Sequence, residues 1–107
     1  MIVSFGNREL LELCSSLGKA EELLGSLHAQ ALINLVADIE AFGSAADLMD
    51  FLGDDACVAN DDALHLTIGL DYEGSFLAVD ARIVRTGAGT IDWTSIRRLK
   101  LVQIVGK

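Results

Sequence analysis

The sequence predicts an α+β domain in which helices cover one face of a small antiparallel sheet, and three observations support this. Residues 64–84 show the two-residue alternation of a pair of strands joined by a polar turn. Residues 19–42 place apolar side chains three or four positions apart, as an amphipathic helix does. The helical patterns precede the hairpin and a further apolar strand follows it, a segregation typical of α+β domains.

The length and composition fit one compact domain spanning 1–107. The chain has 107 residues, of which 51% are hydrophobic, so it can bury a core without a metal or a disulfide. Its apolar runs fall well short of the roughly 18 residues that a membrane span needs. No basic start followed by a long apolar region marks a signal peptide. We therefore expect a cytoplasmic protein that makes no membrane contact.

The first half of the chain predicts one short strand followed by three helices. In chain order, we expect a strand at 2–5 and helices at 8–14, 19–42 and 45–52. Asn7 is a good N-cap for the first helix. Ser44, followed three positions later by Asp47, is close to a capping box for the third. The opening strand is too short to stand alone, so it must pair within the sheet.

The second half predicts three strands. Leu64, Leu66 and Ile68 alternate with polar residues in the first of them. Residues 71–74 supply the turn, with Gly74 free to adopt a positive φ, and the second strand follows. After a connection at 86–90, residues 97–105 form the last strand. The predicted order is β-α-α-α-β-β-β.

Residue types that bind metals occur without the spacing that a metal site requires. Cys14, His28, Cys57 and His65 are zinc ligand types, but no zinc motif connects them. The acidic loop at 53–62 lacks the ligand order and closing Glu of a calcium loop. The cysteines are not in C-x-x-C spacing, and packed reduced thiols are favoured over a disulfide. We therefore expect no cofactor.

The charge is divided unevenly along the chain. The net charge is −8, yet residues 1–80 hold fifteen acids against two bases, a net −13. Residues 81–107 hold one acid against six bases, a net +5. An acidic molecule repels polyanions at long range, whereas the basic C-terminal quarter attracts them. Two interpretations stay open: these bases pair with the acidic helices, or they contact nucleic acid.

Four stretches of the sequence resemble one known family. MIVSFGNRELLEL resembles its opening strand and helix, and IEAFGSAADLMDFL resembles its long helix followed by a short segment. LHLTIGLDYEGSFLAV resembles its strand–turn–strand unit, and GTIDWTSIRRLKLVQIV its terminal strand, the most specific of the four matches. Together they resemble the RelE superfamily of bacterial toxins, and within it the plasmid-maintenance killer proteins of the HigB kind.

The resemblance implies a RelE-like fold and a ribonuclease that enters the ribosome and cuts messenger RNA. Such enzymes lack a metal. Their basic side chains stabilise the charge that develops as the RNA 2′-hydroxyl attacks the adjacent phosphate. The resemblance also implies a partner protein, an antitoxin that neutralises the toxin, in addition to the ribosome and messenger RNA.

The sequence departs from the family where the chemistry lies. Many members have a Tyr-Arg pair where this chain has Phe76 and Leu77, and members commonly finish with a polar end such as Asp-Tyr-His. Any remaining activity would need a rearranged set of bases. The candidate catalytic residues are Arg82, Arg85 and Lys107, and the candidate nucleic-acid-binding residues are Arg97, Arg98 and Lys100.

The sequence leaves three functions open. The first is a toxin–antitoxin-type protein that acts by binding a protein and has weak or lost mRNA-cleaving activity. The second is an active, metal-independent and ribosome-dependent mRNA endoribonuclease. The third is an unrelated small α+β binding protein. The charge balance and the missing arginine and histidine favour the first.

Overall fold

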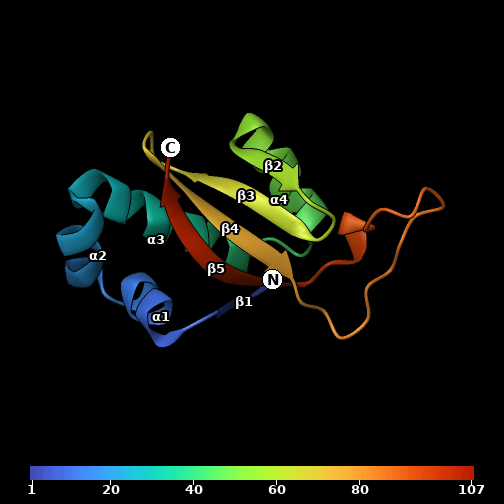
Figure 1. Ribbon diagram of the computed structural model, residues 1–107, viewed down its shortest axis with the longest axis horizontal. Coiled ribbons are helices and arrows are strands. Elements are labelled where there is room, and N and C mark those ends of the chain that lie inside the picture. The colour runs from blue at the N-terminus through green and yellow to red at the C-terminus, as the bar shows by residue number, and fades with distance from the viewer.

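The computed structural model describes residues 1–107 as an α+β protein with four α-helices and one five-stranded mixed sheet (Figure 1). The helices are α1 (Arg8–Ser15), α2 (Leu17–Leu24), α3 (Ser26–Ala41) and α4 (Ala45–Leu52). The strands are β1 (Ile2–Phe5), β2 (Ala56–Ala59), β3 (Ala63–Ile68), β4 (Tyr72–Ala78) and β5 (Arg98–Gly106). The α+β class expected from the sequence is therefore confirmed.

The sheet has the strand order β1-β5-β4-β3-β2 and is not wholly antiparallel. The β3–β4 hairpin lies inside it, with β2 antiparallel to β3 and β5 antiparallel to β4. β1 pairs with β5 in parallel. The expected antiparallel β-α-α-α-β-β-β arrangement is therefore wrong in its strand directions and in its number of elements. Side-chain alternation reports which face of a strand is buried but not which way its neighbour runs.

The long helix expected at 19–42 is two helices. Gly25 ends α2 and begins α3 with φ 85° and ψ 165°, a conformation outside the helical region. Glycine adopts it without a Cβ clash. The break lets α2 fold back against α3, and both helices keep apolar spacing. The apolar spacing continues through Gly25, so it gave no sign that the chain changes direction there.

Two features of the predicted strands also differ. The β3–β4 turn falls at 69–71, where Gly69 has φ 63°, and Gly74 lies inside β4. A Cβ on Gly74 would come within 2.9 Å of the Phe76 ring, so this glycine is required by packing. The loop at 53–62 contains β2, an edge strand too short to produce a recognisable alternation.

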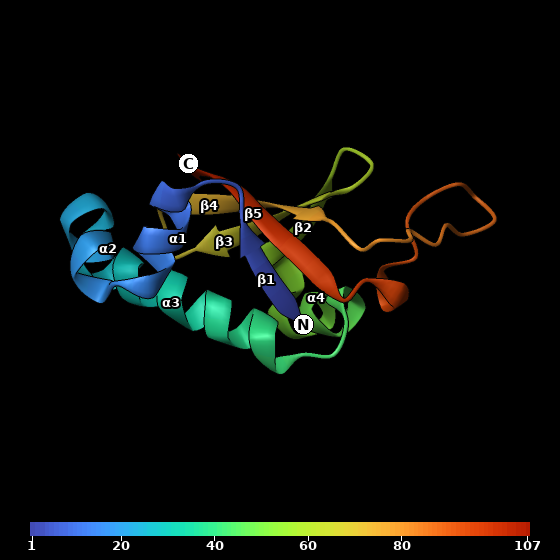
Figure 2. The same ribbon diagram turned by 90° about the horizontal axis from the view of Figure 1, so that it is seen from below.

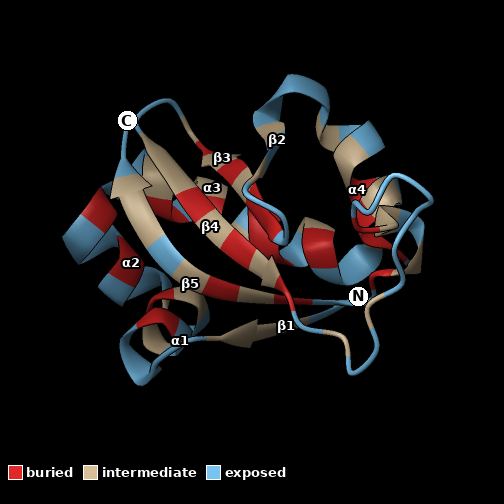
Figure 3. Cartoon of the chain, turned by 45° about the vertical axis from the view of Figure 1, so that its right-hand side comes forward, coloured by how far each residue is buried: buried red, intermediate tan, exposed pale blue.

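The core lies between the sheet and the helices. In Figure 2, α3 and α4 run beneath the sheet, while the opposite face of the strands carries no helix. Buried and partly exposed residues alternate along β3 and β4, as the banding in Figure 3 shows. Leu64, Leu66, Phe76 and Leu101 are fully buried and meet Leu32 and Ile39 of α3 in one cluster.

The connection between β4 and β5 is an arm that extends away from the sheet (Figure 1). It closes on itself, because Thr86 N donates to Thr90 O at 2.8 Å and Asp92 N donates to Val84 O at 2.9 Å. The arm then returns through a short 3₁₀ turn, Trp93–Ser95, into β5. It carries Arg82 and Arg85, two of the three residues that the sequence singled out as catalytic candidates.

Candidate functional site

The face of the sheet that no helix covers is the first candidate site, and we call it the uncovered face. Its residues alternate with core residues along the strands and are paired side by side across them. They include Ser4 of β1, Cys57 of β2, His65 and Thr67 of β3, Glu73, Ser75 and Leu77 of β4, and Arg98 and Lys100 of β5. These residues are mostly polar, and none is an aromatic residue of the kind on which a base stacks.

Two of the three predicted nucleic-acid-binding residues lie on this face. Arg98 is exposed, and Lys100 pairs across the sheet with Leu77. Arg97 is turned elsewhere, because its Nη1 donates to Thr94 O at 2.6 Å and its backbone N–H donates to the Asp80 carboxylate. Arg98 and Lys100 are therefore the two basic side chains that β5 places on the uncovered face.

The three predicted catalytic residues do not converge. The two terminal guanidinium nitrogens of Arg85, Nη1 and Nη2, donate to the Asp61 carboxylate at 2.9 and 2.7 Å, and Nη1 also donates to Gly89 O. Lys107 Nζ donates to Thr67 Oγ1 at 3.1 Å. Asp61 precedes β3 and Thr67 lies near its far end, so at ~3.3 Å per residue these two bases are roughly 20 Å apart.

The ion pair between Arg85 and Asp61 also changes the pKa of both groups. The guanidinium holds the pKa of the Asp61 carboxyl below its ordinary value, and the carboxylate raises the pKa of Arg85. Arg82 is an exposed residue of the same arm. Arg85 and Lys107 are therefore too far apart to bind the same phosphate.

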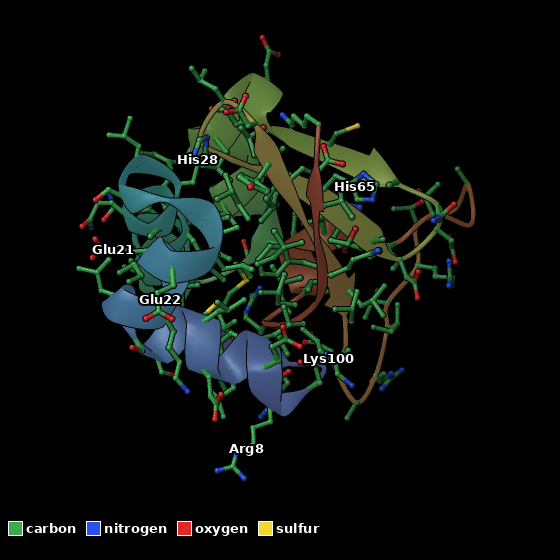
Figure 4. The ribbon with its side chains drawn as sticks, turned by 60° about the vertical axis from the view of Figure 1, so that its left-hand side comes forward. Arg8, Glu21, Glu22, His28, His65 and Lys100 are labelled. Carbon is green, nitrogen blue, oxygen red and sulfur yellow. The ribbon has the colours of Figure 1, made fainter.

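A histidine–carboxylate contact that the sequence did not predict lies on the uncovered face. His65 Nδ1 is 3.0 Å from Glu73 Oε1, and the two side chains are about one-third and one-quarter exposed. Figure 4 shows His65 and Lys100 on the same side of the sheet, with Glu21 and Glu22 projecting from α2 on the other side of the molecule. The hairpin register could have revealed the pair, because Glu73 is diagonal to His65 across β3 and β4.

Cysteine or metal chemistry has little support from the geometry. Cys57 lies directly across from His65, but its thiol contacts Val58 O at 3.5 Å rather than the imidazole. Burial raises the pKa of the Cys14 thiol to about 11, so Cys14 stays protonated at neutral pH. Both thiols are free. No three His, Cys, Asp or Glu side chains are grouped so that they could hold a metal ion.

A second candidate site is a pocket of about 370 Å³ between the first two helices and the sheet, which we call the α1–α2 pocket. Its size falls in the range of small-ligand and side-chain pockets. It is lined by Asn7, Glu9, Leu10 and Leu13, by Leu23 and Leu24, and by Tyr72, Val102, Gln103 and Ile104. Seven of these ten residues are hydrophobic, and the one charged residue is an acid.

The fold and these sites define a small α+β protein with a mixed sheet, one polar sheet face and an apolar pocket with an acidic residue. Comparison with family models, curated proteins and solved structures finds no match. None of the helices combines the length and apolar character needed to cross a membrane.

Proposed function

We propose that this chain is a protein-binding module of the toxin–antitoxin type, with a RelE-like fold and little or no capacity to cut messenger RNA. The main support for the lost activity is the separation of Arg85 and Lys107 to opposite ends of β3. A phosphodiester reaction needs its charge stabiliser and its acid within the same few ångströms.

The missing groups account for a large loss of rate. Loss of one preorganised charge stabiliser typically lowers the rate by about 10²–10³. Loss of a general acid lowers it by about 10²–10⁴. Leu77 faces Lys100 across the sheet, where the family resemblance would place an arginine. Because such losses are not additive, we expect residual cleavage near background rather than a product of the two factors.

Protein binding is supported by the surface that remains. The α1–α2 pocket has a mostly apolar lining, and Leu23 within that lining is 59% exposed. A net charge of −8 disfavours RNA and favours a basic partner. The toxin–antitoxin context is supported by the sequence resemblance, and an adjacent reading frame encoding a small DNA-binding protein would support it further.

Expression of the chain alone in a bacterium tests this proposal. We expect normal growth and intact messages, because Arg85 and Lys107 do not lie close enough together to act on one phosphate. A Leu77→Arg variant places one cation beside Lys100. Weak cleavage by that variant would indicate a ribonuclease fold that has lost its catalytic residues. Leu77→Gln is the uncharged control. Rapid growth arrest with cut messages from the unaltered chain would contradict the proposal.

A further inference from the structure

The strand β5 has a main-chain edge that β1 leaves open. β1 pairs with β5 only over Arg98–Leu101, whereas β5 stays paired with β4 as far as Gly106. The last bond on the β1 side is from Gly6 N to Leu101 O, at 2.8 Å. The chain then leaves the sheet and enters α1, so the rest of β5 has no strand beside it.

The unpaired main-chain groups belong to Ile104 and Gly106. Lys107 N donates to Asp71 O, on the β4 side. Because main-chain groups alternate in direction along a strand, those of Gly106 and Ile104 point to the open edge. No hydrogen bond within the chain reaches β5 from that side beyond Leu101. Such an edge is a template for an added strand.

The α1–α2 pocket lies directly beside this edge. Val102, Gln103 and Ile104, the residues of β5 where β1 has ended, form one wall of it. Leu10 and Leu23 contribute to the opposite side, from α1 and α2. An open edge next to an apolar pocket is the arrangement used for strand addition, in which main-chain bonds supply affinity and a pocket selects side chains.

The charges around the pocket favour a basic ligand. Glu9 is the one charged residue in its lining. The helices α1 and α2 together hold four acids and two bases, and both of these bases, Arg8 and Lys19, contact Glu12. Neither base of these helices contacts Glu21 or Glu22, and Figure 4 shows both projecting from α2.

We infer that the open edge of β5 binds an extended segment of a partner protein, which adds a strand beside Ile104 and Gly106. The segment places one large apolar side chain in the α1–α2 pocket and carries Lys or Arg next to it. This inference rests on the proposed function, because it specifies how the chain binds a protein. A second copy of the chain fits less well, since pairing two β5 edges brings the acidic α1–α2 regions of both copies together.

The probe is a displayed library of random peptides about nine residues long, selected on the full chain. We expect the recovered peptides to share an extended apolar pattern with a basic residue beside the anchor. Binding of one such peptide is then compared between Gly106→Pro and Gly106→Ala. Proline removes an N–H that has no partner within the chain, so the fold should tolerate it. A Cβ at 106 meets nothing closer than 3.9 Å, so alanine is a matched control.

We expect the proline variant to bind the peptide roughly tenfold more weakly, and the alanine variant to bind as the unaltered chain does. Glu9→Gln should reduce the salt dependence of binding, whereas Glu22→Gln, outside the pocket lining, should change it less. A library that yields no basic apolar motif, or equal binding by both Gly106 variants, would overturn the inference.

Two further outcomes separate this inference from the function on which it rests. Concentration-dependent dimers that Gly106→Pro dissolves would overturn the partner segment in favour of a second copy. Selected peptides whose binding is unaffected by Gly106→Pro but abolished in another surface variant would refute the edge and leave protein binding intact. Messenger cleavage by the chain alone would refute the proposed function, whatever the peptides show.

Discussion

Among the individual residues, His28 connects the helical layer to the sheet. Its Nε2 is 3.4 Å from the Asp71 carboxylate, and its ring packs edge-on against Tyr72 with the centroids 5.1 Å apart. Gly69 makes room for it, because a Cβ at that position would come within 2.6 Å of the imidazole. No sequence pattern predicts this role for His28, which follows from the position of Gly69 in the turn.

Replacing Gly69 with alanine should destabilise the fold by about 1–3 kcal/mol, through a positive φ and a clash with His28. The measurement is urea unfolding followed by circular dichroism, with unchanged m-value. Gly43→Ala is the control, because Gly43 has an ordinary φ and open space around its Cα. Equal midpoints for the two variants would show that His28 and the turn are free to move apart.

Among the elements, the arm between β4 and β5 is held to the β2–β3 turn by one bidentate ion pair. Arg85 reaches Asp61 from inside the arm, and its bond to Gly89 O joins the two sides of the arm. Both charged side chains are about half exposed, so the pair contributes more to the position of the arm than to global stability.

The Asp61→Asn variant should therefore release the arm while the melting temperature barely changes. Trypsin should cut after Arg82 or Arg85 faster than in the unaltered chain, and Asp62→Asn, one residue away, is the matched control. A cleavage rate that is the same in all three proteins would mean that the arm is held by its internal hydrogen bonds alone.

The same ion pair predicts a pH dependence. The folded pKa of Asp61 lies below its ordinary value of 3.8, so the ion pair is complete well above that pH. It breaks as the pH falls through the lowered folded pKa, when the carboxylate takes up a proton. The NMR signals of the Arg85 guanidinium should shift over that acid range and stay constant from about pH 5 to 7. A transition near neutral pH would contradict this assignment.

Across the whole molecule, acidic helices lie on one side of the sheet, and two bases, the exposed Arg98 and the half-buried Lys100, lie on the other. RNA binding on the uncovered face should depend on Arg98 and Lys100, since the Arg97 guanidinium is directed to Thr94 O. Removing a base that neutralises one phosphate of single-stranded RNA reduces the salt slope of log affinity by about 0.7. The Arg98→Ala, Lys100→Ala double variant should therefore lose the residual binding of a single-stranded RNA while its stability is unchanged.

Lys19→Ala, on α2, removes one positive charge from the other side of the molecule and is the control for that experiment. Fluorescence anisotropy over a salt series measures both affinity and slope. Unchanged slopes in the double variant would show that these bases do not neutralise RNA phosphates.

Features that depend on near neighbours were predictable from the amino-acid sequence. Asn7 and Ser44 cap their helices by accepting bonds from Leu10 N and Asp47 N, as their spacing predicted. The strands at 2–5 and near 64–78 and 98–106 were also expected from short patterns. These features follow from interactions within a few residues, so a local pattern is enough to predict them.

The meeting of distant segments, in contrast, depends on the tertiary structure. The parallel pairing of β1 with β5, the His65–Glu73 pair and the pocket all join residues far apart in the sequence or depend on an exact register. Apolar spacing around Gly25 suits one long helix as well as two, and the packing of α2 against α3 selects the second arrangement. The separation of Arg85 from Lys107 also depends on the tertiary structure. The sequence shows that both bases are present, but the hairpin register determines the distance between them.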